Sequence, residues 1–273
     1  MDDADKSVLR RATVDGVLWL TKVDPSRSNG LSLAMVGALE QALDSCGDVR
    51  ALVIDAADGF HGPAVLVTEM AEDPATLGTD DYQRIVAIGR QLGDRIASLP
   101  IPVIGIVRAG ALGGGLELLM RADFLFCTDR SRFKLPEAAF GFVAAWGGSQ
   151  WSSRQMPFRR AQELLLLART FGGREAEEAG LVTRSFAADE ALDAHVEETL
   201  ARLRCISPAA FRETKRSLAA RWDGPLDHGL AAEADCQMRS MVSGDFVEGM
   251  AAAASRSDYD FVAKRVVTRR SPA

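Results

Sequence analysis

Runs of strand-forming residues alternate with helical patterns along the first two thirds of the chain, and this alternation constrains the fold more than any other feature. Residues 51–55 and 103–107 are apolar and rich in branched side chains, as buried strands are. Between them, a helical pattern over residues 82–99 brings its apolar side chains onto one face: Ile85, Ile88, Leu92, Ile96 and Leu99. Strand, helix and strand in this order predict right-handed crossover connections, so we expect an α/β fold.

The N-terminal part begins with a hairpin signal. Residues 8–14 and 16–23 are typical of two strands, and Asp15 with the glycine that follows it favours a tight turn between them. Ser32 is a suitable N-cap for the helix expected next. These signals place a short antiparallel pair ahead of the alternating region.

From about Ser207 the pattern becomes helical. Ser207 is a good N-cap, and Pro208 then occupies the first helical position, where proline is favoured. We therefore expect two domains, an α/β core over residues 1–205 and a helical subdomain over residues 206–273. Within the latter, residues 265–273 are expected to form a frayed tail.

Composition narrows the classes of partner. The 273-residue chain is 47% hydrophobic and 26% charged, as ordinary globular proteins are, and its formal net charge is -6. A negative charge without basic clusters argues against nucleic acid or an anionic membrane as a partner. No apolar run reaches the roughly 20 residues of a membrane span, and the acidic N-terminus lacks the features of a signal peptide. Four cysteines without CxxC spacing predict neither a zinc site nor a disulfide framework, so we expect a cytoplasmic protein.

Two glutamates lie in apolar surroundings next to a glycine-rich turn. Residues 113–115 are three consecutive glycines, Glu117 follows them, and Glu137 comes twenty residues later. A lone glutamate is usually a solvated surface residue. Here, however, the glycines allow the backbone to approach a ligand closely, and carboxyl groups in apolar surroundings are suited to proton transfer near neutral pH. An enzyme that stabilises an oxyanion and moves protons is therefore the leading interpretation.

Other motifs each fail at one position. A Walker loop requires Gly-Lys-Ser/Thr, whereas Gly115 is followed by Leu116, and the dinucleotide fingerprint requires a third glycine where this chain has Leu118. The stretch around Ser149 resembles a nucleophile elbow, but Trp151 replaces its last glycine. The three histidines do not have the spacing of a metal site, so no metal is expected.

An ordered set of segments resembles one known family. These segments are residues 101–107, 110–117, 121–123, 133–137, 147–150 and 179–182. In this order they resemble the enoyl-CoA hydratase/isomerase (crotonase) superfamily, in its hydratase-like branch. The resemblance implies a crotonase-like α/β fold, with a core of repeated ββα units and a C-terminal helical segment that serves for oligomerisation. It also implies a homo-oligomer, either a trimer or a dimer of trimers.

The resemblance implies roles for individual residues. Glutamates at the positions of Glu117 and Glu137 are the acid/base pair of the hydratase branch, whereas other branches usually retain one of them. The backbone N–H groups of Gly114 and Ala64 would form the oxyanion hole, and Gly114 is expected at the start of a helix, where free N–H groups attract negative charge. The remaining candidates are for substrate binding: Leu66, Gly113, Trp146, Phe261 and Lys264.

Pro63 and Trp146 both depart from the family's pattern. Pro63 stands where the family has glycine, and because proline restricts its own backbone and that of Gly62, we expect the loop before Ala64 to follow a different path. Trp146 stands where the family has a small residue. As a pocket wall its indole would exclude long straight acyl chains, and as a core aromatic it would only pack; the sequence leaves both readings open.

The sequence thus predicts a lyase similar to enoyl-CoA hydratases, which hydrates a short or branched 2-enoyl thioester without a metal or redox cofactor. The expected partner is acyl-CoA or an acyl-carrier thioester. Two alternatives remain open. One is other enolate chemistry, namely isomerisation, decarboxylation or thioester hydrolysis, and the other is a non-catalytic scaffold that binds a thioester.

Overall fold

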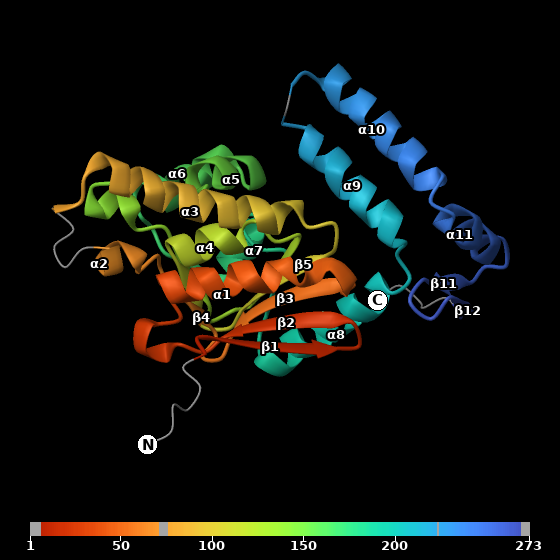
Figure 1. Ribbon diagram of the computed structural model, residues 1–273, viewed down its shortest axis with the longest axis horizontal. Coiled ribbons are helices and arrows are strands. Elements are labelled where there is room, and N and C mark those ends of the chain that lie inside the picture. The colour runs from red at the N-terminus through yellow and green to blue at the C-terminus, as the bar shows by residue number, and fades with distance from the viewer. Residues whose placement is uncertain (1–6, 71–75, 223, 269–273) are drawn as a thin grey trace. The chain divides into compact units, whose positions relative to one another are not determined.

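The computed structural model describes residues 7–70, 76–222 and 224–268, and Figure 1 shows the course of the chain. The chain divides into two compact units, Met1–Asp193 and Ala194–Ala273. The division falls within helix α8 (Asp189–Leu203), earlier than the boundary expected after residue 205.

The larger unit is built on a six-stranded sheet with the order β1-β2-β3-β5-β7-β10. Its strands are β1 (Leu9–Val14), β2 (Val17–Lys22), β3 (Ala51–Ala56), β5 (Val103–Val107), β7 (Phe124–Thr128) and β10 (Arg184–Phe186). β1 and β2 pair antiparallel, and the pairs from β2 to β10 are parallel. The hairpin and the crossover connections predicted from the sequence are therefore confirmed.

A second, four-stranded sheet has the order β4-β6-β8-β9. It consists of β4 (Phe60–His61), β6 (Gly110–Leu112), β8 (Arg132–Lys134) and β9 (Phe171–Gly172). Because β4, β6 and β8 pair in parallel, their carboxyl ends meet at one edge of the sheet. Ala64, Gly114 and Glu137 follow these three ends along the chain, and the sheet thus brings them together.

Helices cover the sheets of this unit. They are α1 (Leu33–Asp44), α2 (Leu66–Met70), α3 (Thr79–Ser98), α4 (Gly114–Leu119), α5 (Gly148–Gln155), α6 (Phe158–Leu166) and α7 (Gly173–Glu178). Figure 1 shows α1, α4 and α3 on the same side of the six-stranded sheet. Ser32 caps α1 as expected, because its hydroxyl accepts a hydrogen bond from Met35 N at 3.0 Å.

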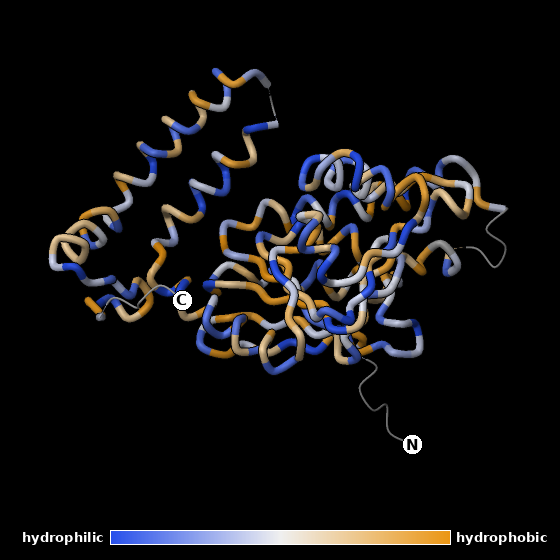
Figure 2. Tube along the Cα trace, turned by 180° about the vertical axis from the view of Figure 1, so that it is seen from behind, coloured by the Kyte–Doolittle hydropathy of each residue, from blue (hydrophilic) through white to orange (hydrophobic). Residues whose placement is uncertain are grey.

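The core of the larger unit lies between these helices and the sheet. On α3, Ile85, Leu92 and Ile96 are buried, as the helical pattern predicts. Ile88 and the residue that follows the helix, Leu99, pack against the core and stay partly exposed. Figure 2 shows hydrophobic residues recurring through the strands. Across the three described stretches of the chain, none of the helices is both long and apolar enough to cross a membrane.

The second unit is mainly helical, as predicted. Its helices are α9 (Pro208–Ala220), α10 (Leu226–Met241) and α11 (Asp245–Ala254). Ser207 caps α9 by accepting a hydrogen bond from Ala210 N at 3.0 Å. Along α9 and α10, hydrophobic and hydrophilic residues alternate (Figure 2), which is typical of helices with one apolar face.

The expectation of a frayed tail from residue 265 is wrong where the structure describes it. β11 (Asp258–Asp260) and β12 (Arg265–Val267) pair as an antiparallel hairpin. The charged and proline-containing end of the sequence suggested fraying, but backbone pairing with β11 outweighs it over residues 265–267. Residues 269–273 lie outside the described part.

Candidate active site

Glu117 is a buried carboxylate at the centre of the site. It lies on α4, which begins after Gly113, whose φ of 51° is in the region that favours glycine. The Glu117 side chain is 4% exposed, and its Oε1 accepts hydrogen bonds from Trp146 N at 2.9 Å and Gly148 N at 2.7 Å. Burial raises the pKa of Glu117 to about 7, although these two hydrogen bonds oppose the shift.

Glu137 is the second buried acid. It opens the 3₁₀ helix Glu137–Phe140, which follows β8, and is 6% exposed. Burial raises its pKa, and its charge in turn contributes to the raised pKa of Glu117. Among the residues that the structure describes, none forms a hydrogen bond with Glu137 Oε2. A Cβ on Gly113 would lie 3.0 Å from Glu137 Oε1, so the carboxyl group rests against the glycine-rich turn.

The two backbone positions expected to form an oxyanion hole are neighbours. A Cβ added at Gly114 would lie 3.1 Å from Ala64 Cβ. No acceptor among the described residues takes a hydrogen bond from Ala64 N or Gly114 N. Two residues with unengaged N–H groups are therefore neighbours, and the turn that carries Gly114 also contacts Glu137.

Pro63 does not move Ala64 away from Gly114. A Cβ on Gly113 would lie 3.4 Å from Pro63 Cβ, so the proline packs against the same turn. The different path expected for this loop is thus not a displacement that separates Ala64 from Gly114.

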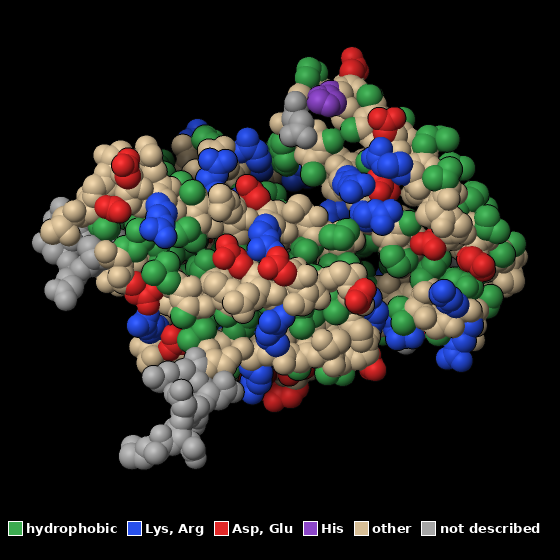
Figure 3. Space-filling model, viewed as in Figure 1, with side chains coloured by type: hydrophobic (Ala, Val, Ile, Leu, Met, Phe, Trp, Pro, Cys, Tyr) green, Lys and Arg blue, Asp and Glu red, His purple; other side chains and the backbone are tan. Residues whose placement is uncertain are grey.

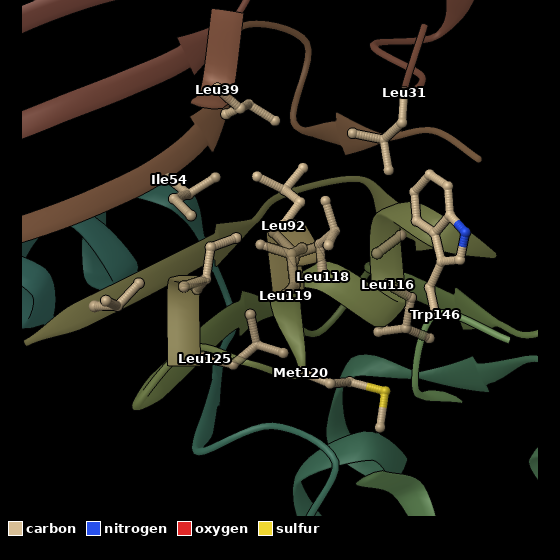
Figure 4. Packing of buried hydrophobic residues seen from close by; sticks show 14 of the residues in the cluster. Leu31, Leu39, Ile54, Leu92, Leu116, Leu118, Leu119, Met120, Leu125 and Trp146 are labelled. Atoms are coloured by element: carbon tan, nitrogen blue, oxygen red, sulfur yellow. The ribbon is translucent and has the colours of Figure 1, made fainter. Parts of the chain in front are cut away.

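Trp146 fills the space between these donors and α3. Its side chain is 3% exposed, and its indole Nε1 donates to Ile85 O at 3.0 Å. The ring occupies a notch at Gly89, where a Cβ would come within 1.8 Å of it, and a Cβ on Gly114 would lie 3.0 Å from Trp146 Cε3. Figure 4 shows the indole between Leu31 and Leu116. Its burial makes Trp146 a core aromatic, and its ring also packs against Gly114, which carries one of the two N–H groups.

The other expected binding residues are distributed differently. Leu66 is fully buried in the hydrophobic core, and Gly113 borders Glu137. Phe261 and Lys264 belong to the second unit, where Phe261 packs edge-on against Tyr259 with ring centroids 4.9 Å apart. The structure therefore brings together the two acids, Ala64, Gly113, Gly114 and Trp146, and leaves the roles of Phe261 and Lys264 as predictions.

Sequence reasoning missed Arg121 as a residue of the site. It is 7% exposed, donates to Trp146 O at 3.0 Å and pairs with Asp94 at 2.9 Å. Its positive charge lowers the pKa of Glu117, against the larger effect of burial. A signal was present, because an arginine directly after the apolar helix that contains Glu117 has to be paired when the helix is buried.

The described residues contain no group of three or more histidine, cysteine, aspartate or glutamate side chains arranged to hold a metal ion.

Comparison with known proteins identifies the family. The model of the enoyl-CoA hydratase/isomerase family matches residues 13–264. The chain therefore belongs to this family. A Mycobacterium leprae protein named "Probable enoyl-CoA hydratase" is 31% identical to it over 240 residues, which are 87% of this chain and 90% of that protein. The 2,3-dehydroadipyl-CoA hydratase of Escherichia coli is 27% identical over 90% of this chain and 94% of its own.

Solved structures agree with the fold. Pseudomonas aeruginosa AtuE has a TM-score of 0.83 and 32% sequence identity, and the match covers 91% of this chain and 97% of AtuE. An enoyl-CoA hydratase/isomerase from Cupriavidus metallidurans, at 24% identity, has a TM-score of 0.84. The resemblance and the crotonase-like α/β fold predicted from the sequence are confirmed, and the chain is an enzyme of the hydratase type.

Proposed function

We propose that this protein catalyses the reversible hydration of a short or branched 2-enoyl-CoA thioester. The observation that carries the proposal is the meeting of two buried carboxyl groups, Glu117 and Glu137, with the unengaged N–H groups of Ala64 and Gly114 at one edge of the small sheet. Hydration needs a base that deprotonates water, an acid that protonates C2, and hydrogen-bond donors that stabilise the negative charge on the thioester oxygen. The names of the relatives support the same class of reaction.

Glu117 is the proposed base. Its Oε1 is held by two backbone N–H groups, which fixes the carboxylate and leaves Oε2 to accept a proton from water. As the water oxygen forms its bond to C3 of the enoyl group, the electron pair of the C2–C3 double bond moves toward the carbonyl and gives an enolate. Glu117 takes the proton that the water loses.

Glu137 is the proposed acid. Burial raises the pKa of Glu137, which favours its protonated form near neutral pH. Its buried Oε2 has no partner in the described part of the chain, as suits an atom that delivers a proton to the substrate. Transfer of that proton to C2 collapses the enolate and gives the 3-hydroxyacyl thioester. The two acids exchange their protonation states, so water and the thioester balance the reaction without a metal or redox group.

The enolate oxygen would lie between Ala64 N and Gly114 N. Gly114 is the first residue of α4, where the free N–H groups of the helix and its dipole favour negative charge. Loss of one such donor costs about 2.7–4 kcal/mol of transition-state stabilisation in measured cases. Both donors together are then a major part of the expected rate enhancement.

A panel of enoyl thioesters that differ in length and branching tests this function. We expect the absorbance of the conjugated enoyl group to fall on addition of the enzyme to crotonyl-CoA or a branched analogue. Parallel assays with crotonyl attached to an acyl-carrier protein distinguish the two thioester carriers. Absence of hydration across the whole panel, with a folded protein, would contradict the proposal and favour other enolate chemistry.

The proposed assembly is a homo-oligomer, a trimer or a dimer of trimers. The second unit exposes apolar side chains that a protein of this kind usually covers: Leu218, Leu226, Leu230, Met238, Val242, Phe246, Val247 and Met250. Figure 3 shows hydrophobic side chains gathered over α10 and α11. Phe261 and Lys264 of this unit would contact CoA. The four cysteines are free thiols, which supports the proposed cytoplasmic location.

A further inference from the structure

A hydrogen bond to the carbonyl oxygen of the Pro63–Ala64 peptide fixes the direction of the Ala64 N–H. Pro63 O accepts from Leu31 N at 2.8 Å. In a trans peptide the carbonyl and the following N–H point in opposite directions within one plane. The bond from Leu31 therefore turns the Ala64 N–H away from Leu31. The next two N–H groups, of Val65 and Leu66, both donate to Leu31 O at 3.2 and 3.1 Å, so Ala64 alone keeps its N–H unengaged in this stretch of described residues.

Residues 29–31, which we call the brace, are themselves held firmly. Asn29 is 1% exposed and has a φ of 52°, an uncommon value for a residue other than glycine. Asn29 N donates to Asp24 O and Asn29 Oδ1 accepts from Asp24 N, each at 2.7 Å. Asn29 Nδ2 donates to Asp58 Oδ1 at 2.6 Å, and Asn29 O accepts from Lys22 Nζ at 3.0 Å.

The brace and the loop of Ala64 touch without spare room. A Cβ on Gly30 would lie 2.9 Å from Pro63 O, and a Cβ on Gly62 would lie 3.0 Å from Gly30 N. Because interiors packed this closely transmit small shifts, a movement of the brace must move the Pro63–Ala64 peptide.

Lys22 is the unusual member of this arrangement. It ends β2, it is 3% exposed, and burial lowers its pKa to about 7, against the opposing effect of Asp58. A buried amine is costly unless it is hydrogen-bonded. Charged or neutral, it keeps an N–H for Asn29 O, so its contact with the brace does not depend on its protonation state.

We propose that Lys22 is a positioning residue for the oxyanion hole, which holds the brace through Asn29 O and thereby aims the Ala64 N–H at the thioester oxygen. This inference rests on the proposed function, because it takes Ala64 as a donor to that oxygen. Lys22 does not touch the substrate and acts through the brace and Pro63.

The test compares Lys22→Met with Lys22→Gln. Methionine keeps the length and apolar stem but cannot donate, whereas the glutamine amide retains a donor for Asn29 O. We expect Lys22→Met to lower kcat for enoyl thioester hydration by about 10–100-fold, less than complete loss of a donor, with KM little changed. Lys22→Gln should recover much of this loss. Methionine also removes the free-energy cost of burying an amine. We therefore expect the melting temperature to stay close to that of the wild type while kcat falls.

A spectroscopic measurement separates positioning from general damage. The carbonyl stretch of butyryl-CoA labelled with ¹³C at the carbonyl shifts to lower frequency when N–H groups polarise the bond, and this saturated thioester cannot be hydrated. We expect a smaller shift when it binds to Lys22→Met than to the wild type or Lys22→Gln. Equal shifts together with an unchanged kcat would overturn the inference.

The outcomes also distinguish this inference from the proposed function. If the wild type hydrates no enoyl thioester, yet the carbonyl shift is present and Lys22→Met reduces it, the brace is supported and the hydratase function is not. Should Lys22→Met fail to fold, Lys22→Leu, which likewise lacks a donor for Asn29 O, takes its place in the carbonyl measurement. A smaller shift than in Lys22→Gln supports the inference, and an equal shift overturns it.

Discussion

Buried glutamates in the two units of this protein have opposite electrostatic surroundings: Glu213 in one, and Glu117 with Glu137 in the other. Glu213 on α9 is 2% exposed, and three arginines donate to it: Arg212 and Arg216 at 3.0 Å and Arg239 at 2.7 Å. These contacts lower its pKa to about 2. Glu117 and Glu137 are buried to a similar degree, but burial dominates there and raises both pKa values. Burial alone therefore does not make an acid a candidate for catalysis, whereas burial that no matching cation compensates does.

The largest expected effect is the loss of turnover when Glu117 or Glu137 is replaced. Glu117→Gln and Glu137→Gln should each lower kcat by about 10²–10⁴-fold, because the amide keeps the shape and removes proton transfer. Both variants should remain folded and still bind butyryl-CoA. Glu178→Gln, at an exposed position on α7, is the matched control and should keep wild-type kcat. Near-normal activity in either folded site variant would reject the two-acid mechanism and point to a one-acid reaction.

Removing Trp146 tests whether its indole limits the space available to the acyl chain beside the two acids. Trp146→Ala opens space beside Gly114, so hexenoyl and octenoyl thioesters should gain relative to crotonyl, by up to about 0.8 kcal/mol for each methylene buried. Loss of a core tryptophan typically costs about 3–5 kcal/mol of stability. Chain-length preference and melting temperature are measured together, with the half-exposed Trp222→Ala as control. An unchanged preference with a large loss of stability would make Trp146 a purely structural residue.

How far the sequence predicted this arrangement depends on the range of the interactions involved. Periodicity and capping residues such as Ser32 and Ser207 predicted the helices, since these are local signals. The two acids were singled out by their apolar surroundings beside the glycine-rich turn, and the resemblance supplied their roles and their N–H partners. The notch at Gly89 that receives Trp146 was not, because its partners lie far apart in the chain. Nor was Lys22 foreseen, since a lysine at the end of a strand gives no sign that it is buried.

Replacing Glu213 tests the other half of the comparison, namely that this buried glutamate serves stability and not turnover. Glu213→Gln removes the charge that three arginines share, so the melting temperature should fall by several degrees, because the remaining cations repel one another. The hydration rate per folded molecule should change far less than in Glu117→Gln. Calorimetry and the enoyl assay on the same sample measure both. A loss of turnover as large as that of Glu117→Gln, without loss of structure, would show that the contrast between the two regions is wrong.

The smallest expected effect is the pH dependence of stability, and its sign differs between the two regions. Glu117 has a folded pKa of about 7 against an ordinary value of 4.5, so below pH 4.5 it is protonated in both the folded and the unfolded chain. As the pH rises from there to about 7, the unfolded chain releases a proton that the folded chain retains. The free energy of unfolding then falls, by at most about 1.4 kcal/mol per pH unit for one group.

For Glu213, with a folded pKa of about 2, stability is present above its ordinary value of 4.5 and is lost as the pH falls toward 2. Chemical denaturation of the wild type, Glu117→Gln and Glu213→Gln from about pH 5 to about pH 8 should therefore show Glu117→Gln gaining on the wild type as the pH rises. Over the same range Glu213→Gln should stay below the wild type by a nearly constant amount, and it should approach the wild type only in acid. Parallel curves for the wild type and Glu117→Gln would mean that Glu117 is ionised with an ordinary pKa, and the distinction between its surroundings and those of Glu213 would then lose its physical basis.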